Sequence, residues 1–260
     1  MTTQVIQMEP KTPWLIRCCV WLLIFLHVLR GVLTLCCFFP FIKDQKKREY
    51  IQQWSMRLLT IFRIELKVRG SEQLPNASYL LASNHISWLD IHVINAFQPI
   101  RFVAKSEVAS WPVFGWMAQQ LRTVFIRRDN LRHAREVVGQ VAEVLKTESI
   151  CIFPEGTSTL GDEVLPFKPN LFESASLAGV PTFSLAIQYR SVVTGKRSYS
   201  PAFIGDMGLL ESMANIIQNR YLRAELTVLP SMESLENTPL DRKLLALHSQ
   251  EAIAKILQAY

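Results

Sequence analysis

His85 and Asp90 are the two residues whose types and spacing most clearly suggest chemistry. The apolar run 79–83 predicts a strand that ends just before His85, and ligands gather at strand ends in open α/β sheets. An aspartate five residues later, at the start of a helix, can accept a hydrogen bond from the imidazole, so that the other ring nitrogen is free to take a proton. A lone histidine is more often structural, so the pair indicates a general base without naming a reaction.

The segment 153–158 supplies a second set of candidate groups after another apolar strand. Glu155 can accept a hydrogen bond from a hydroxyl, and Gly156 lets the backbone approach a bound group closely. Thr157 and the amides around it can donate to an oxyanion or a phosphate. Taken alone, the segment is equally compatible with an ordinary turn between a strand and a loop.

Basic residues at two further strand ends form the third candidate element. Lys105 closes the predicted strand 101–104, and Arg127 and Arg128 close the predicted strand 123–126. Arginine side chains suit bidentate contact with a phosphate. Solvated charge is an equally good interpretation of each residue taken singly.

These groups need a sheet whose strand ends meet at one edge, and the rest of the sequence predicts such a sheet. Short β-rich runs alternate with segments of helical periodicity, which is typical of an α/β domain with a mixed, largely parallel sheet flanked by helices. The predicted strands cover residues 79–83, 101–104, 123–126, 149–153, 182–187 and 224–229. A capping box from Thr238 to Asp241 predicts a C-terminal helix. We expect the α/β domain over residues 64–260, after a membrane-associated helical segment over residues 1–63.

The segment 14–42 is apolar apart from three residues. As a helix, residues 18–42 would be about 37 Å long, which exceeds the roughly 30 Å of a hydrocarbon core. Because Arg30 divides the run and Pro40 would break its last turn, a membrane span and two short helices in the lipid interface both remain open. A buried helix pair is the alternative without a membrane. Basic residues follow at 43–48, which predicts the cytoplasmic face, and the inner membrane if the protein is bacterial.

Composition points to the same kind of partner. The chain has 28 Lys and Arg against 22 Asp and Glu, a net charge of +6, with 49% hydrophobic residues. A phospholipid membrane is both negative and apolar, so it fits this composition better than nucleic acid does. The five cysteines lack the spacing of a disulfide framework or a zinc site, because four of them form two adjacent pairs in the apolar segment.

Taken together, the motifs resemble those of the lysophosphatidic acid acyltransferase family, the 1-acylglycerol-3-phosphate O-acyltransferases. His85 and Asp90 match the family's His-x-x-x-x-Asp motif, and residues 153–157 match its Phe-Pro-Glu-Gly-Thr block. Residues 101–105 and 125–128 resemble the blocks between these two motifs. The resemblance covers about residues 65–190.

This resemblance implies a membrane enzyme of phospholipid biosynthesis. It would move a fatty acyl group from acyl-CoA or acyl carrier protein to the free hydroxyl of lysophosphatidic acid. His85 and Asp90 would be catalytic, without an acyl-enzyme, a metal or a tightly bound cofactor. The acceptor-binding residues that it implies are Lys105, Arg127, Arg128, Glu155, Gly156 and Thr157.

Three departures from the family pattern lie near the expected head-group pocket, at Ser158, at Arg122 and at residues 169–170. They bear on the acceptor more than on the reaction, so acylation of lyso-ornithine lipid, which a sister group of similar sequences performs, is the alternative. A non-catalytic membrane lipid-binding module and a lipid hydrolase, in which His85 would activate water, are the other classes. An acyl group that appears in a diacyl product, and not as free fatty acid, distinguishes the transferase.

Overall fold

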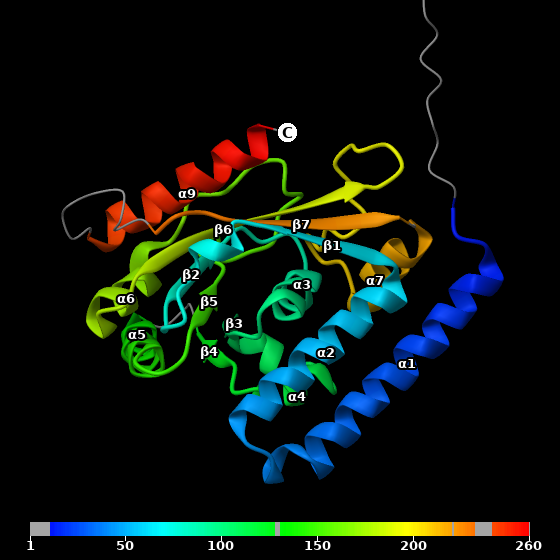
Figure 1. Cartoon of the computed structure of the whole chain (residues 1–260), viewed down its shortest axis with the longest axis horizontal. Coiled ribbons are helices and arrows are strands. Elements are labelled where there is room, and N and C mark those ends of the chain that lie inside the picture. Colours follow the sequence, from blue (N-terminus) through cyan, green and yellow to red (C-terminus); the bar gives the residue numbers. More distant parts are fainter. Residues whose placement is uncertain (1–10, 128–130, 220, 232–240, 260) are drawn as a thin grey trace, which may run out of the picture.

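The computed structural model describes residues 11–127, 131–219, 221–231 and 241–259, and this part of the chain contains one seven-stranded sheet (Figure 1). The strands are β1 (Ile64–Arg69), β2 (Leu80–Ser83), β3 (Arg101–Lys105), β4 (Val124–Ile126), β5 (Ile150–Ile152), β6 (Thr182–Ser191) and β7 (Leu222–Val228). They lie in the order β1-β7-β6-β2-β5-β3-β4. Strands β6 and β7 pair antiparallel, whereas every other neighbouring pair is parallel. The expected mixed, largely parallel sheet is confirmed.

Helices cover both faces of this sheet (Figure 1). They are α1 (Trp14–Cys37), α2 (Asp44–Phe62), α3 (Leu89–Phe97), α4 (Phe114–Gln120), α5 (Leu131–Leu145), α6 (Glu173–Ala178), α7 (Leu209–Gln218) and α9 (Arg242–Gln258). Helices α5, α6 and α9 pack on one face, and α2, α3 and α7 pack on the other. Short 3-10 helices cover Phe39–Phe41, Ser71–Gln73, Ser106–Ser110 and Pro169–Phe172.

Strand β2 shows how the sheet positions the candidate residues. Leu80 and Ala82 pack into the core under α5 and α9, while Leu81 packs into the core under α2 and α3. A strand that is buried on both faces is typical of a parallel sheet with helices on both sides. Because β2, β3 and β5 run parallel, their carboxyl ends meet at one edge of the sheet, and His85 follows β2 at this edge.

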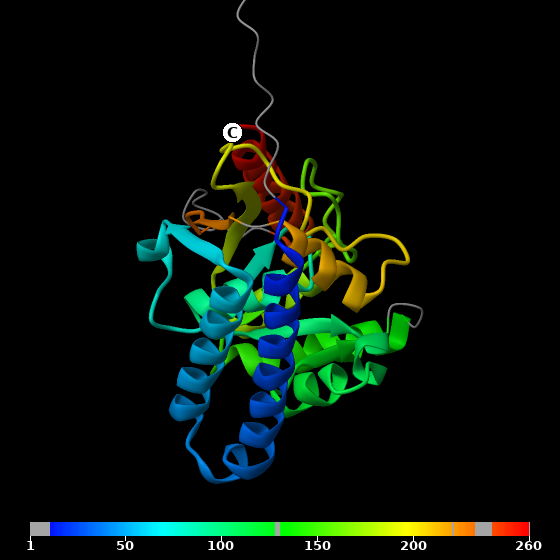
Figure 2. The ribbon, with the colours of Figure 1, turned by 90° about the vertical axis from the view of Figure 1, so that its right-hand side faces the viewer.

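Helix α1 is continuous from Trp14 to Cys37 and passes Arg30 without a break, so two separate short helices are not formed. It runs antiparallel to α2, and the two helices lie side by side (Figure 2). Gly31 permits this contact, because a Cβ atom there would lie 2.7 Å from the indole Nε1 of Trp54. Just before α1, the Thr12 amide donates to the Gln218 carbonyl at the end of α7, at 3.0 Å. Helix α1 is thus fastened to the rest of the molecule at its start and along its length.

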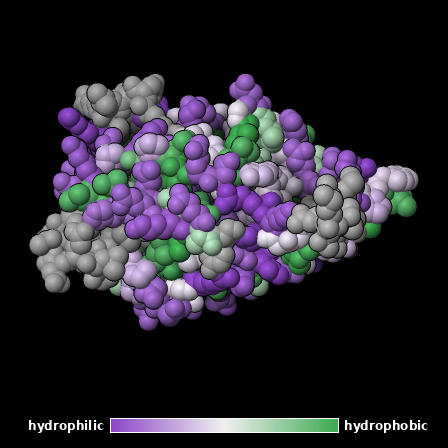
Figure 3. Space-filling model, turned by 90° about the horizontal axis from the view of Figure 1, so that it is seen from above, coloured by the Kyte–Doolittle hydropathy of each residue, from purple (hydrophilic) through white to green (hydrophobic). Residues whose placement is uncertain are grey.

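The face of α1 that points away from the molecule is apolar. The large hydrophobic residues exposed on α1 are Trp14, Leu15, Leu22, Leu23, Phe25, Leu26, Leu29 and Leu33. By contrast, hydrophilic residues predominate on the face of the molecule seen in Figure 3, where apolar residues are scattered. In the described chain, the segment Trp14–Phe41 is the one helix long and apolar enough to cross a membrane. Leu58 and Phe62 of α2 share a hydrophobic core with the sheet. The expected boundary between a membrane-associated segment, residues 1–63, and an α/β domain, residues 64–260, stays a prediction.

Candidate active site

The structure brings His85 and Asp90 into direct contact. The imidazole Nδ1 lies 2.8 Å from the Asp90 carboxylate Oδ2. Asp90 is in the first turn of α3, which turns its side chain back toward the end of β2. The Asp90 side chain is fully buried, whereas about a fifth of the His85 side chain is exposed. Because a carboxylate can only accept, Nδ1 carries the proton and Nε2 is left as an acceptor.

Four donors hold the Asp90 carboxylate. The backbone amides of Ile86 and Ser87 donate to Oδ2 at 2.7 and 2.9 Å, in addition to His85. The Tyr189 hydroxyl donates to Oδ1 at 2.7 Å. Tyr189 lies on β6 and is buried, and this burial raises the pKa of its hydroxyl well above its usual range. The sequence did not single out Tyr189, although it completes the support of the pair.

Glu155 binds the backbone next to His85 and does not line the cavity that His85 borders. Its side chain is buried, and its two carboxylate oxygens accept from the backbone amides of His85, at 2.7 Å, and of Leu165, at 3.0 Å. Burial raises the pKa of Glu155 from the ordinary 4.5 to about 7. The geometry therefore makes Glu155 a positioning residue, where a contact with the acceptor was expected.

The rest of the 153–158 segment lies against the imidazole. The Phe153 ring stacks on His85, with centroids 4.1 Å apart and an angle of 19° between the planes. Gly156 has a φ of +77°, in the left-handed region that favours glycine, and this turn brings Gly156 and Thr157 to the lining of a cavity. The Thr159 amide donates to the His85 carbonyl at 2.9 Å and joins the two segments.

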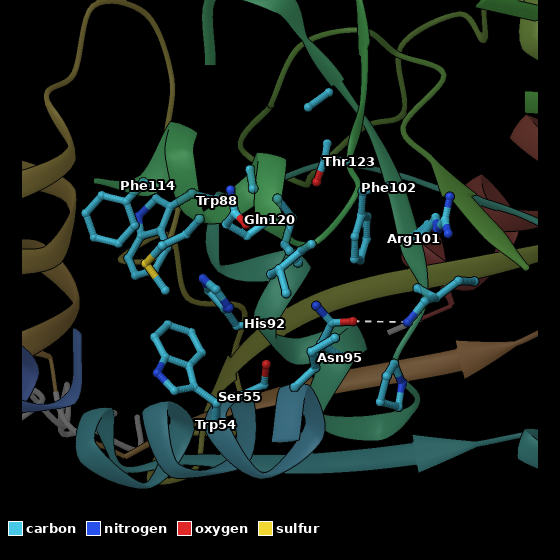
Figure 4. Close-up of a pocket in the computed structure, with 18 of the residues that line it drawn as sticks. Trp54, Ser55, Trp88, His92, Asn95, Arg101, Phe102, Phe114, Gln120 and Thr123 are labelled. Carbon is cyan, nitrogen blue, oxygen red and sulfur yellow. Dashed lines mark hydrogen bonds between the residues drawn. The ribbon is translucent and has the colours of Figure 1, made fainter. Parts of the chain in front are cut away.

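This cavity has a volume of about 810 Å³ and is lined by His85 and by residues of α1, α2, α3, α4 and β3. Figure 4 shows part of its lining. Its apolar walls include Trp54, Trp88, Phe102 and Phe114. The volume falls in the range of sites for small organic ligands. The arrangement can place a hydroxyl beside the imidazole while an apolar chain occupies the cavity.

Three basic residues were expected to bind the acceptor, and within the described chain one of them lines the cavity. Lys105 lines the cavity and lies 3.0 Å from the Glu107 carboxylate. Arg127 is exposed after β4 and does not line the cavity, and Arg128 lies outside the described residues. Five arginines that were not predicted to bind the acceptor do line the cavity: Arg30, Arg48, Arg57, Arg101 and Arg122.

Among the arginines that line the cavity, Arg101 and Arg122 each have an acidic neighbour. Arg101 contacts Glu148 at 2.7 Å, and Arg122 lies 3.8 Å from Asp44. Among the residues that the structure describes, no cluster of three or more His, Cys, Asp or Glu side chains could hold a metal ion. The basic groups that line the cavity, partly neutralised by these acidic neighbours, form its basic rim.

Comparison with known proteins agrees with this geometry. A family model described as Acyltransferase matches residues 65–188. A lyso-ornithine lipid O-acyltransferase of Pseudomonas aeruginosa is 34% identical over 201 residues, which are 77% of this chain and 75% of that protein. A 1-acyl-sn-glycerol-3-phosphate acyltransferase of Neisseria meningitidis is 32% identical over 245 residues, which are 94% of this chain and 91% of that protein.

A solved structure has the same fold. The 1-acyl-sn-glycerophosphate acyltransferase PlsC of Thermotoga maritima superposes with a TM-score of 0.67 at 20% identity, over 94% of this chain and 95% of that protein. The family model spans both the His85–Asp90 motif and the segment that contains Glu155. The chain therefore belongs to the acyltransferase family, with relatives named for two different lysolipid acceptors.

Proposed function

We propose that this enzyme transfers a fatty acyl group from an acyl thioester, acyl-CoA or acyl carrier protein, to the free hydroxyl of lysophosphatidic acid. The product would be phosphatidic acid. The observation that carries the proposal is the buried Asp90 that orients His85 in the lining of a cavity with apolar walls. The Neisseria meningitidis relative, which matches 94% of this chain, supports the choice of acceptor.

In this mechanism His85 acts as a general base. Its Nε2 takes the proton of the acceptor hydroxyl, and the oxygen attacks the thioester carbonyl while Asp90 stabilises the imidazolium. Collapse of the tetrahedral intermediate breaks the carbon–sulfur bond, and the imidazolium returns the proton to the leaving thiolate. Cys151 is fully buried in β5, and burial raises the pKa of its thiol well above the usual range, so it is no candidate for a covalent step. The reaction requires no metal and no bound cofactor besides the thioester co-substrate.

The acceptor phosphate would lie at the basic rim. Lys105 borders the cavity and can reach an anion there. We assign Arg128 to the same role, and Arg127, which does not line the cavity, to a secondary one. The Thr157 hydroxyl is exposed at the cavity and can donate to the phosphate or to the developing oxyanion. Gly156 would let the acceptor approach the backbone closely.

The apolar outer face of α1 supports a location at the membrane. Because α1 also packs against α2, α4 and α7, we propose that it lies in the lipid interface and does not leave the molecule as a separate span. Lys43, Lys46 and Arg48 follow α1 and would contact anionic phospholipids at the cytoplasmic face of the inner membrane.

Acylation of lyso-ornithine lipid is the second candidate, supported by the Pseudomonas aeruginosa relative. The deciding experiment offers lysophosphatidic acid and lyso-ornithine lipid side by side with a labelled acyl thioester, followed by mass analysis of the products. We expect the label in phosphatidic acid. A product formed only from lyso-ornithine lipid would move the proposal to that acceptor, whereas label in free fatty acid alone would indicate a hydrolase, and lipid binding without turnover would indicate a non-catalytic module.

Replacement of Tyr189 by phenylalanine should lower kcat about tenfold and change the KM for the acceptor little. The reason is that Tyr189 orients Asp90 from inside the core, and its loss leaves a buried carboxylate oxygen without this donor. Steady-state kinetics of the purified enzyme would show the split between kcat and KM. Tyr79→Phe is the matched control, since Tyr79 is also buried but lies away from Asp90. If kcat fell equally in both variants, the effect of Tyr189 would be that of any buried tyrosine, and its role would be structural.

Glu155→Gln should remove a pH dependence of stability between about pH 4.5 and 7. Because the folded state raises the pKa of Glu155 to about 7, it binds the proton more tightly than the unfolded state. The residue therefore stabilises the fold most below pH 4.5, and this contribution, roughly 3 kcal/mol, is lost as the pH rises through 7. Denaturation of both proteins in detergent from pH 4.5 to 8 measures the difference. A difference in free energy of unfolding that stays constant over this range would contradict the assignment.

A further inference from the structure

The cavity contains a group of polar side chains that the proposed mechanism does not use. His92 on α3 extends into the cavity between the rings of Trp54 and Trp88, whose centroids lie 5.2 and 5.7 Å from its own. Asn95 lies one turn further along α3, and Ser55 faces them from α2. In Figure 4 the His92 ring, the Asn95 amide and the Ser55 hydroxyl are directed into the same space.

These groups retain free hydrogen-bonding capacity. Asn95 uses its Oδ1 to accept from the Ile100 amide at 3.1 Å, which leaves its amino group without a partner among the described residues. Neither His92 nor Ser55 forms a side-chain hydrogen bond within that part of the chain. Burial lowers the pKa of His92 to about 4, so at neutral pH its ring is uncharged and offers one donor and one acceptor.

A second imidazole, which is buried, borders the same cavity. His27 on α1 stacks on Trp54, which also contacts His92. The ring centroids of His27 and Trp54 lie 4.4 Å apart, with an angle of 22° between the planes. The His27 side chain is buried, and within the described residues its Nε2 has no hydrogen-bond partner. Buried polar atoms are nearly always paired in folded proteins, and His27 Nε2 departs from this rule. The His92 ring, the Asn95 amino group and the Ser55 hydroxyl line the cavity, where a polar group of a ligand can pair with them.

An unsubstituted acyl chain cannot supply that group. A hydroxyl on the chain can, because it accepts one hydrogen bond and donates another. From this juxtaposition we propose that the cavity is a subsite for a hydroxylated fatty acyl chain, whose hydroxyl is bound by His92, Asn95 and Ser55. The proposal rests on the proposed function, since it takes the cavity beside His85 to receive an acyl chain.

The test compares acyl chains of equal length with and without a hydroxyl. In one arm the hydroxyl is on the acyl-CoA donor, at carbon 2, at carbon 3 or near mid-chain, and in the other arm it is on the chain of the lysolipid. We expect wild type to prefer one hydroxylated chain over the unsubstituted chain at least tenfold in kcat/KM, and the arm that shows the preference identifies the substrate that occupies the cavity. No preference in either arm would overturn the proposal.

Two variants show whether the polar group is responsible. His92→Phe keeps an aromatic ring between Trp54 and Trp88 but removes both ring nitrogens, and Ser55→Ala removes one hydroxyl. Each should lower the preference ratio, by about tenfold for His92→Phe, because a buried partner of the hydroxyl is lost. His248→Phe on α9, across the sheet, is the matched control and should keep the ratio. An unchanged ratio in His92→Phe would also overturn the proposal.

A binding measurement separates this proposal from the proposed function. The His85→Ala variant is expected to lose nearly all turnover, and equilibrium dialysis in detergent can compare its affinity for a hydroxylated and an unsubstituted fatty acid. We expect tighter binding of the hydroxylated chain, and His92→Phe in the same background should abolish the difference. If wild type shows no acyl transfer but this difference persists, the proposed function fails while the subsite stands. Equal affinities refute the subsite.

Discussion

Replacement of His85 by alanine is expected to lower acyl transfer to lysophosphatidic acid by about 10³-fold or more, within the range that a general base contributes. Asp90→Asn should come close to this loss, although it preserves volume. Asp90 Oδ2 alone accepts from His85 Nδ1 and from the Ile86 and Ser87 amides. An asparagine amide can keep its one oxygen toward these three donors and its amino group toward the Tyr189 hydroxyl, but it has no negative charge, so the imidazolium that forms on His85 loses its stabilisation. The measurement is kcat and KM of the purified variants.

The controls separate chemistry from folding. Both variants should still bind vesicles, because the outer face of α1 is unchanged, and His248→Ala on α9 should keep full activity. Asp90 is wholly buried, so its variant is also checked by thermal denaturation in detergent. Near wild-type turnover by a folded His85→Ala enzyme would eliminate the mechanism.

Much of the sheet could be predicted because its central strands are short, apolar and enclosed by turns. All six predicted strands occur, with ends that differ by a few residues. Strand β1 was missed, although residues 64–69 alternate apolar and charged side chains, as a half-exposed edge strand does. Strand β6 continues to Ser191, beyond the predicted end at residue 187, because β7 pairs with it antiparallel over this extension. A long-range pairing of this kind leaves no local signal.

The same distinction between local and distant signals applies to the site. His85 and the 153–158 segment each follow a strand of the sheet, and these strands are parallel neighbours. Their meeting at one edge of the sheet could therefore be predicted. Tyr189 could not, since the contact with Asp90 joins residues 99 positions apart. The role of Glu155 was also hidden, because backbone amides and not side chains are its partners. The predicted C-terminal helix occurs, but its start was wrong: Asp241 is itself the N-cap of α9, whereas the capping box placed the cap at Thr238, which lies outside the described residues.

Replacement of Leu22, Phe25 and Leu29 together by aspartate should release the enzyme from membranes. These side chains lie on the outer face of α1 and are 59%, 64% and 44% exposed, so their loss leaves the core intact. Burying each in lipid is worth about 1.5–3 kcal/mol, and three together shift the partition coefficient by at least about 10³-fold. Co-sedimentation with anionic phospholipid vesicles measures this shift. Activity toward lysolipid in vesicles should fall in parallel.

A matched variant tests whether the position of these residues matters. Leu244 and Leu247 on α9 are 42% and 47% exposed, on the opposite side of the sheet. Their replacement by aspartate adds similar charge and removes similar apolar surface, yet it should leave vesicle binding unchanged. The triple α1 variant should also keep the thermal stability of wild type in detergent and its turnover of lysolipid in mixed micelles. If it stayed on the vesicles, the apolar face of α1 would not be the membrane contact, and the cavity beside His85 would have to receive lipid by another route.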